Sequence, residues 1–404
     1  MSLMRTVNFS LPVRERSGQG WRVSTTIEVD EQRYDVWYRS SKGPIADGVE
    51  TFLAACIVPA MRLGYAVKPP APVSGLLLNG IAHFQNTLHG WFPELLPVPI
   101  LAETRTTTTE RAAGVGSFFS CGVDACFSLL KHYNEITDTV LIHGFDFPVT
   151  HALSCETVSR MAQHATERLK RPLIEVETNI RDFGDHYADW GAAYHGSVLA
   201  SVALLLSPQL STMYIPSSYP YADLFPWGSH PELDPLWSNE EVDIVHDGCE
   251  TSRVRKVARI AQSDAALSVL RVCWSEFKTR GEAINCGKCE KCIRTMIDLR
   301  VAGALEQSST FRRPLKLSEV KLVDMREGNH HLFYQSTLEE LNRTGKDPQL
   351  AAAIRECLSG RHYRGVEGAW RDASIHFKKS LIRPFFRPFE RSARWVSRPF
   401  QRQA

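Results

Sequence analysis

Strand-like apolar runs alternate with helical patterns from residue 112 to about residue 272, and this alternation restricts the fold more than any other feature. Strands and helices in regular alternation form a mostly parallel sheet with helices on both faces. We therefore predict an α/β fold. The predicted strands are Gly116–Phe119, Thr139–His143, Leu173–Thr178, Thr212–Pro216 and Val242–His246. The predicted helices are Val123–Tyr133, Cys155–Leu169, Ala192–Leu206 and Arg253–Gln262.

Small or polar residues follow each predicted strand. In parallel sheets, ligands bind beyond the carboxyl ends of the strands, so these residues are expected to meet along one edge. The segments concerned are Ser120–Asp124, Gly144–Asp146, 178–179, Ser217–Asp223 and Asp247–Glu250. The sequence thus predicts one ligand site formed by several strand ends.

The first of these segments belongs to a strand, a tight turn and a helix start, spanning Ser117–Asp124. A helix N-terminus presents unpaired N–H groups and the positive end of the helix dipole, which suit phosphate. Small residues in the turn let a ligand approach the backbone. An ordinary strand-to-helix connection explains the same stretch about equally well, because short motifs often occur by chance.

The regions on either side of this alternation have other patterns. Residues 1–110 read as an α+β domain with a hairpin in Trp21–Arg39 and helical patterns in Gly48–Leu63 and Val73–Leu88, and this region covers or completes the next domain. Residues 111–310 form the α/β domain, and residues 311–377 are a helical extension. Asp347 followed by Pro348 is typical of a helix start in that extension.

Charge is concentrated at the C-terminus. Residues 361–404 hold eleven Lys and Arg against three Asp and Glu, a balance of +8, so the rest of the chain carries 2 − 8 = −6. Residues 378–404 also interleave aromatic side chains with arginine. Such a tail can bind RNA, an anionic membrane or a protein partner, and a solvated flexible terminus accounts for it equally well.

The sequence favours a soluble, cytoplasmic protein. The longest apolar run, Val198–Leu206, is too short to cross a bilayer, which takes roughly 18 residues. Residues 1–12 lack the basic start and apolar core of a secretory signal. Several of the ten cysteines have the spacing of metal ligands, which is typical of a reducing compartment.

Cys286, Cys289 and Cys292 are the strongest chemical signal in the chain. Their Cys-x-x-Cys-x-x-Cys spacing lets three thiolates meet at one ion, and structural zinc requires four ligands. Cys273 is the preferred fourth ligand, with Cys249 or a histidine as alternatives. Zinc is favoured over an iron–sulfur cluster, which also uses cysteines, and over unrelated free thiols.

These motifs carry a family resemblance that covers roughly residues 112–305. The run from Ser120 to Ala125, Ser-Cys-Gly-Val-Asp-Ala, resembles the S-G-G-x-D-S signature of PP-loop ATP pyrophosphatases. A cysteine followed by C-x-x-C-x-x-C, roughly 150 residues downstream, resembles the zinc site of the 7-cyano-7-deazaguanine synthases within that superfamily.

The resemblance implies a Rossmann-like HUP fold and an ATP-dependent ligase. Such enzymes cleave ATP to AMP and pyrophosphate, adenylate a carboxylate or carbonyl oxygen, and let an amine displace AMP. The implied cofactors are ATP, Mg²⁺ and Zn²⁺, and the expected partners are a small-molecule or protein-borne acceptor and a second copy of the chain. Ser120 and Asp124 are the implied catalytic residues. The implied nucleotide-binding residues are Ser120, Cys121, Gly122, Val123, Asp124, Ala125, Gly144, Ser217, Ser218, Asp223, Arg253 and Lys256.

Two departures from the signature keep other functions open. Cys121 replaces a glycine, and its Cβ disfavours the backbone angles that glycine adopts. Ala125 replaces a serine and lacks its hydroxyl. The alternatives are a sulfurtransferase acting on a nucleotide or RNA, with Cys121 or Cys249 as the reactive thiol, and a non-catalytic nucleotide-binding scaffold. His195 is expected in the core, and Asp223, Asp234 and Asp247 fit helix caps or turns as well as a site.

Overall fold

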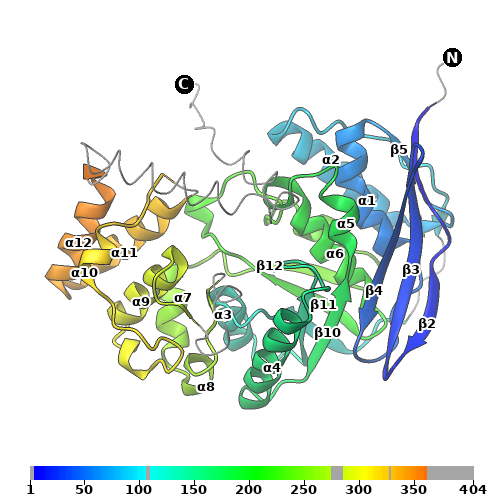
Figure 1. Cartoon of the computed structure of the whole chain (residues 1–404). Coiled ribbons are helices and arrows are strands. Elements are labelled where there is room, and N and C mark those ends of the chain that lie inside the picture. Colours follow the sequence, from blue (N-terminus) through cyan, green and yellow to red (C-terminus); the bar gives the residue numbers. More distant parts are fainter. Residues whose placement is uncertain (1–3, 106–109, 274–284, 327–328, 362–404) are drawn as a thin grey trace. The chain divides into compact units, whose positions relative to one another are not determined.

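The computed structural model describes residues 4–105, 110–273, 285–326 and 329–361 (Figure 1). The contacts divide the chain into two compact units. Unit 1 comprises residues 1–120, 131–217 and 224–249, and unit 2 comprises residues 121–130, 218–223 and 250–404. The predicted tail at residues 378–404 lies outside the described residues.

Unit 1 is built on a ten-stranded sheet in which five neighbouring strands at one end are parallel (Figure 1). The parallel strands are β8 (Gly114–Phe118), β9 (Asp138–His143), β10 (Leu173–Thr178), β11 (Leu210–Pro216) and β12 (Asp243–Asp247). They lie in the order β12-β11-β8-β9-β10. Successive strands are added on one side of β8 as far as β10 and on its other side from β11 onward, so the strand order switches between β8 and β11. In parallel sheets, the carboxyl ends at such a reversal form the usual ligand crevice.

The N-terminal strands extend the same sheet. Strand β4 pairs antiparallel with β10, with Ser40 opposite Val176, and β3 pairs with β4 as the predicted hairpin. Residues 1–110, which the sequence analysis sets apart as an α+β domain, thus share a sheet with the parallel strands. The strands are β1 (Thr6–Phe9), β2 (Val13–Ser17), β3 (Gly20–Val29), β4 (Gln32–Ser40) and β5 (Ala66–Lys68), and a separate short pair is β6 (Val73–Ser74) with β7 (Thr104–Arg105).

Helices α1 and α6 pack together in the main core of unit 1. The Tyr38 hydroxyl shares a hydrogen bond of 2.8 Å with the Ser201 hydroxyl, and the Tyr194 hydroxyl donates to the Ala55 carbonyl at 3.0 Å, so the polar groups buried with these helices are satisfied. Helix α4 packs on β9 and β10. The elements are α1 (Glu50–Leu63), α2 (Gly75–Trp91), α4 (Ala152–Arg168), α5 (Ile180–Gly184), η1 (Trp190–Tyr194), α6 (His195–Leu205) and η3 (Asp234–Trp237).

Unit 2 is helical around a small core of its own. Helix α7 packs against α9 and α11, and α11 packs against α12. The Asp347 side chain accepts from the Leu350 N–H at 3.0 Å, which confirms the predicted helix start at Pro348. The elements are α3 (Val123–Lys131, in unit 2 as far as Leu130), η2 (Tyr221–Asp223), α7 (Arg253–Ile260), α8 (Asp264–Leu267), α9 (Glu290–Val301), η5 (Leu305–Gln307), α10 (Leu317–Val320), α11 (His330–Thr344) and α12 (Pro348–Leu358).

The structure confirms an α/β architecture with a mostly parallel central sheet, and all five predicted parallel strands are present. One helix differs from its prediction. Instead of one helix over 192–206, the chain forms a π-helical turn, η1, and begins α6 at His195. Among the described helices, none combines the length and the apolar character needed to cross a membrane.

Candidate functional site

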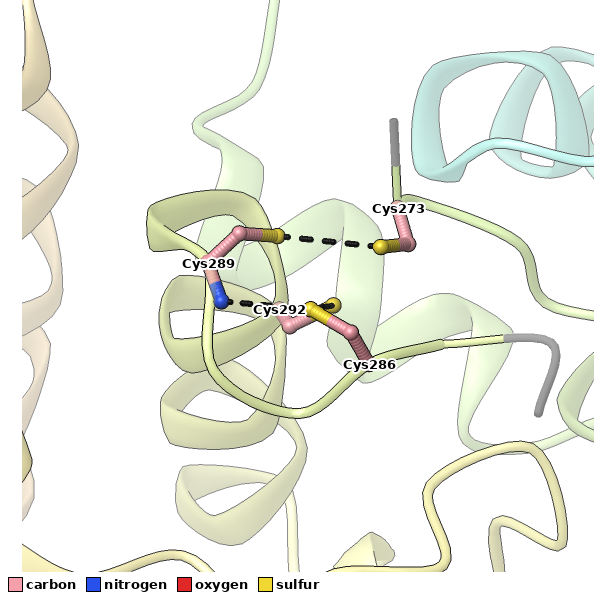
Figure 2. Close-up of side chains that lie close together, drawn as sticks. All are labelled: Cys273, Cys286, Cys289 and Cys292. Atoms are coloured by element: carbon pink, nitrogen blue, oxygen red, sulfur yellow. Dashed lines mark hydrogen bonds between the residues drawn. The ribbon is translucent and has the colours of Figure 1, made fainter. Parts of the chain in front are cut away.

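Four cysteine thiols converge in unit 2: those of Cys273, Cys286, Cys289 and Cys292 (Figure 2). Their sulfur atoms all lie within 4.8 Å of one another. The Cys286 and Cys292 sulfurs are 3.9 Å apart, as are those of Cys289 and Cys273. A tetrahedral ion with metal–sulfur bonds of about 2.3 Å separates its sulfurs by about 3.8 Å. The four cysteines therefore lie close enough to bind a metal, and Cys273 takes the fourth position.

The local sequence explains why these thiols meet. Gly287 has φ 66°, a left-handed conformation that glycine adopts without strain. This turn directs the N–H groups of Lys288 and Cys289 to the Cys286 sulfur, at 3.4 and 3.3 Å. Cys289 is the N-cap of α9, and Cys292 lies in its first turn. Such a turn both orients the ligands and provides donors to a thiolate.

The start of α9 favours deprotonated sulfur. Hydrogen bonds with Cys292, and with Cys286 and Cys273, outweigh burial and hold the pKa of Cys289 below the ordinary thiol value. The positive end of a helix dipole acts in the same direction. A metal binds thiolates rather than thiols, so this environment lowers the cost of assembling the ligand set.

Asn285 holds the two halves of the cysteine cluster together, and sequence reasoning missed it. Its Oδ1 accepts from the N–H groups of Val272 and Cys273, at 2.9 and 3.2 Å. Its Nδ2 donates to the Leu270 carbonyl at 2.9 Å. The side chain is buried and directly precedes Cys286, so it fixes Cys273 beside the other three thiols. An asparagine adjacent to a ligand was the only signal available in the sequence.

We expect Asn285→Ala to weaken metal binding by about 10–100-fold, the usual loss when a group supporting the ligands is removed. The four sulfur ligands remain, but Cys273 is no longer tied to Cys286. Competition with a chromophoric chelator measures the affinity. Asn342→Ala, on α11 of the same unit, is the control. An affinity equal to that of the control would show that Asn285 does not support the metal ligands.

The turn predicted to bind phosphate leads into α3. Cys121 has φ 61°, so this residue adopts the left-handed conformation despite its Cβ. Cys121 thus reaches the backbone angles of the glycine that it replaces, although its Cβ makes them unfavourable. The Cys121 carbonyl accepts from the Arg271 N–H at 2.9 Å, and the Gly122 carbonyl accepts from the Cys126 N–H at 2.9 Å. A non-glycine residue in this region costs about 1–2 kcal/mol, which the surrounding contacts must offset.

Asp124, in the first turn of α3, is held by cations from α7. Its carboxylate lies 3.1 Å from Lys256 Nζ and 3.8 Å from the Arg253 guanidinium. The Ser218 hydroxyl donates to it at 3.4 Å. Burial raises the pKa of Asp124, but Lys256 and Arg253 outweigh burial and lower it below the ordinary value. The structure thus brings Asp124, Ser218, Arg253 and Lys256 together.

Helix α9 adds a mostly buried stripe of charged residues to this cluster, which could not be recognised from the sequence. Glu290, Arg294 and Asp298 are spaced four residues apart and share one face of the helix. Arg253 lies 3.7 Å from Asp298, and Arg294 lies 3.3 Å from Glu290. Burial raises the pKa of Asp298 to about 6 although Arg253 opposes it. Charged residues at this spacing beside the cysteine motif were the available signal.

The remaining predicted nucleotide-binding residues are divided between the two units. Ser120, Gly144 and Ser217 belong to unit 1, whereas Gly122, Val123 and Ala125 belong to unit 2 with Cys121. Gly144 has φ 100°, and a Cβ there would lie 1.9 Å from the Thr178 carbonyl oxygen, so the position requires glycine. Asp223 is the last residue of η2. Burial and the nearby Glu339 raise the pKa of Asp223, whereas His331 lowers it by a smaller amount.

Three other predicted positions have defined surroundings in unit 1. His195 is half-buried, and its Nδ1 lies 3.1 Å from the Trp190 carbonyl oxygen, as suits a histidine packed in the core. Asp234 is fully buried and contacts His246 and Ser229. Asp247 is buried and pairs with Lys131 at 2.7 Å. Asp234 and Asp247 are thus more than turn residues, because each binds a basic side chain.

No family model, curated protein or solved structure matches this chain. Its function is therefore inferred from the residues of the cysteine cluster and of the charged cluster around Asp124.

Proposed function

We propose that this protein is an ATP-dependent, AMP-forming ligase with a HUP-type fold, related to the PP-loop ATP pyrophosphatases. The main support is the position of Asp124 in the first turn of α3, with Lys256 3.1 Å away. A helix start with a neighbouring ammonium group suits a polyphosphate, and a carboxylate there can hold the Mg²⁺ that accompanies it.

Buried cations near this turn support the same function. Arg253 and Arg294 are both buried, and both lower the pKa of Asp124. Arg294 Nη1 has no hydrogen-bond partner among the described residues. Donors held in place before a charged ligand arrives stabilise negative charge that develops during a reaction. A pyrophosphate leaving group develops such charge.

The phosphates of ATP that the protein binds determine which bond of ATP is cleaved. When the β- and γ-phosphates lie on the turn, the α-phosphorus stays open to an incoming carboxylate oxygen. Pyrophosphate then leaves with its charge already neutralised. The adenylated carboxylate, of deazaguanine type or a related acid, is next attacked by an amine, which displaces AMP.

We further propose that the four-cysteine site holds structural zinc. Four thiolates complete a tetrahedral shell and leave no position for water, so the ion stabilises unit 2 and takes no part in the chemistry. The site would fix α9, which carries Arg294 and Asp298. The same helix then links the metal to the charged cluster.

Incubation with ATP, Mg²⁺, ammonium and a carboxylated deazaguanine tests the ligase. We expect AMP and pyrophosphate as products, quantified by chromatography and a coupled pyrophosphate assay. Asp124→Asn should reduce product formation by about 10²–10³-fold, the usual effect of losing one electrostatic group at a reacting phosphate. Asparagine is chosen because its amide oxygen still accepts a hydrogen bond from Lys256.

The control is Asp264→Asn, an exposed carboxylate in the first turn of α8 in the same unit. ADP as the product would contradict the proposed ATP split. Unchanged turnover in Asp124→Asn would show that the Asp124 carboxylate takes no part in the reaction. Nucleotide binding without turnover on a range of small carboxylates would favour the scaffold function instead.

A further inference from the structure

The cysteines of this chain differ in how well a small reagent can reach them. All ten lie within the described residues, and none of them is in a disulfide. Seven are buried, whereas Cys155, Cys286 and Cys289 are half-buried. Cys155 belongs to unit 1, and the other two belong to the four-cysteine site of unit 2. A small oxidant therefore reaches three sulfur atoms first, and two of them lie in one site.

Each half-buried thiol of the four-cysteine site has a buried thiol beside it. The Cys286 sulfur lies 3.9 Å from the sulfur of Cys292, and the Cys289 sulfur lies 3.9 Å from the sulfur of Cys273 (Figure 2). Cys292 and Cys273 are both fully buried. A sulfur that meets an oxidant forms a disulfide when a second sulfur lies within reach. The site thus contains two pairs, each with one accessible sulfur and one partner for it.

Cys155 is equally accessible but has different surroundings. Its thiol donates to the Val149 carbonyl at 3.7 Å, and no sulfur is among its contacts in the described part of the chain. Burial raises the pKa of Cys155, which favours the less reactive protonated thiol. Accessibility alone therefore does not distinguish the four-cysteine site. The presence of a second sulfur beside each accessible one does.

The start of α9 keeps the sulfurs of the site in their reactive form. A metal binds cysteine as the thiolate, and the thiolate is also the form that a peroxide oxidises. Cys289 is the N-cap of α9 and Cys292 lies in its first turn, where the helix dipole favours negative charge. A disulfide sulfur carries no such charge and is no longer a thiolate ligand. Oxidation of the pairs and binding of a metal are therefore mutually exclusive.

We propose that the four cysteines are a redox switch, in which hydrogen peroxide converts them into two disulfides, Cys286–Cys292 and Cys273–Cys289, and the metal is released. The inference rests on the structural zinc proposed above. In each pair, the half-buried thiolate attacks one peroxide oxygen, the O–O bond breaks, and hydroxide leaves and takes up a proton. The buried thiolate then attacks the sulfenic acid, the S–S bond forms, and a second hydroxide leaves and takes up a proton. Each pair loses two electrons, and one peroxide becomes two waters.

The switch acts on the charged cluster through α9. This helix begins next to Cys289, and its Thr295 hydroxyl accepts from Arg253 Nη2 at 3.0 Å. Arg253 in turn lies 3.8 Å from Asp124. Release of the ion removes the attachment that fixes the first turn of α9. The amide hydrogens of this turn should therefore exchange faster in the oxidised protein than in the reduced, metal-bound protein.

Treatment of the full-length, zinc-loaded protein with hydrogen peroxide tests the switch without any variant. A chromophoric chelator should report the release of about one zinc per chain, by the four-ligand rule, whereas untreated protein with the same chelator should keep its ion. Dithiothreitol and added zinc should restore the thiols and the metal content. The Cys155→Ser variant is the control, and its zinc release should equal that of the wild type.

Peptide mass spectrometry without reduction identifies the disulfides. Lys288 and Lys291 separate Cys286, Cys289 and Cys292, so trypsin places each of these cysteines in its own peptide. The expected linked peptides are those of Cys286 with Cys292 and of Cys273 with Cys289. Disulfides that join other cysteines overturn the proposal.

The outcomes separate this inference from the zinc site on which it rests. Purified protein that contains no zinc would contradict both. Zinc-loaded protein that keeps its ion in peroxide overturns the switch alone. The same conclusion follows if the ion is lost while the thiols become sulfinic acids without forming disulfides, since that oxidation is not reversed by dithiothreitol. Unchanged hydrogen exchange in the first turn of α9 after oxidation also overturns the switch.

Discussion

Replacing Cys289 with serine should remove the metal and unfold most of unit 2. A serine hydroxyl is a poor ligand for a soft site of this kind, and three thiolates without an ion repel one another. Zinc bound to a peptide with such a site stabilises it by about 10–16 kcal/mol in apparent free energy, which exceeds the stability of most domains. Loss of one ligand therefore removes a large share of the folding free energy.

Elemental analysis and thermal denaturation measure this result. Wild-type protein should contain about one zinc per four-cysteine site. Cys289→Ser should contain little metal and lose a cooperative transition, while Cys155→Ser, a half-buried thiol of unit 1, should keep both. A wild-type protein that is free of metal and still fully folded would contradict a structural role for the site. So would equal thermal midpoints for Cys289→Ser and Cys155→Ser.

The second large effect concerns the pair formed by Asp124 and Lys256. Only 1% of the Lys256 side chain is exposed, against 20% of the Asp124 side chain. Asp124→Ala removes the carboxylate that balances a buried ammonium, and such a loss costs about 3–5 kcal/mol. The double variant Asp124→Ala, Lys256→Met should recover much of this stability, because the methionine still packs on Phe127, whose ring lies 5.6 Å from the Lys256 ammonium.

Urea denaturation of the two single variants and the double variant gives the coupling energy. The expected cycle is non-additive, with the double variant more stable than Asp124→Ala alone. Asp264→Ala provides the control, since that carboxylate is exposed. Additive losses would mean that the two charges do not depend on each other. This result also explains why asparagine, rather than alanine, is the substitution suited to measuring the role of Asp124 in turnover.

The alternation of apolar and helical patterns was enough to predict the parallel strands, because each is a short run of buried residues bounded by turn residues. Strand β10, for example, is predicted and observed at Leu173–Thr178. The joining of the N-terminal strands to this sheet was not specified, since the pairing of Ser40 with Val176 links residues far apart in sequence. Local patterns carry no information on which edge a distant hairpin will meet.

In the candidate sites too, features set by local sequence spacing were predicted, whereas features that depend on distant parts of the chain were not. The four cysteines were predicted correctly as a cluster, because their spacing alone brings three of them together. Asn285 and Asp298 were missed, because their roles depend on backbone groups and cations that only the fold places beside them. The conformation of Cys121 was also beyond sequence reasoning. Its φ of 61° opposes the preference of the residue and is imposed by its surroundings.

Unit 2 is assembled from three separate stretches of chain, and this affects the order in which the protein can fold during synthesis. The segment at residues 121–130 leaves the ribosome long before α7 and α9, which carry the partners of Asp124. Until residue 301 has been made, Asp124 has none of the α9 charges near it. A nascent chain that stops before this point can complete the sheet of unit 1 but lacks most of the helices that form the core of unit 2. Chaperone binding to such truncated chains is the expected consequence.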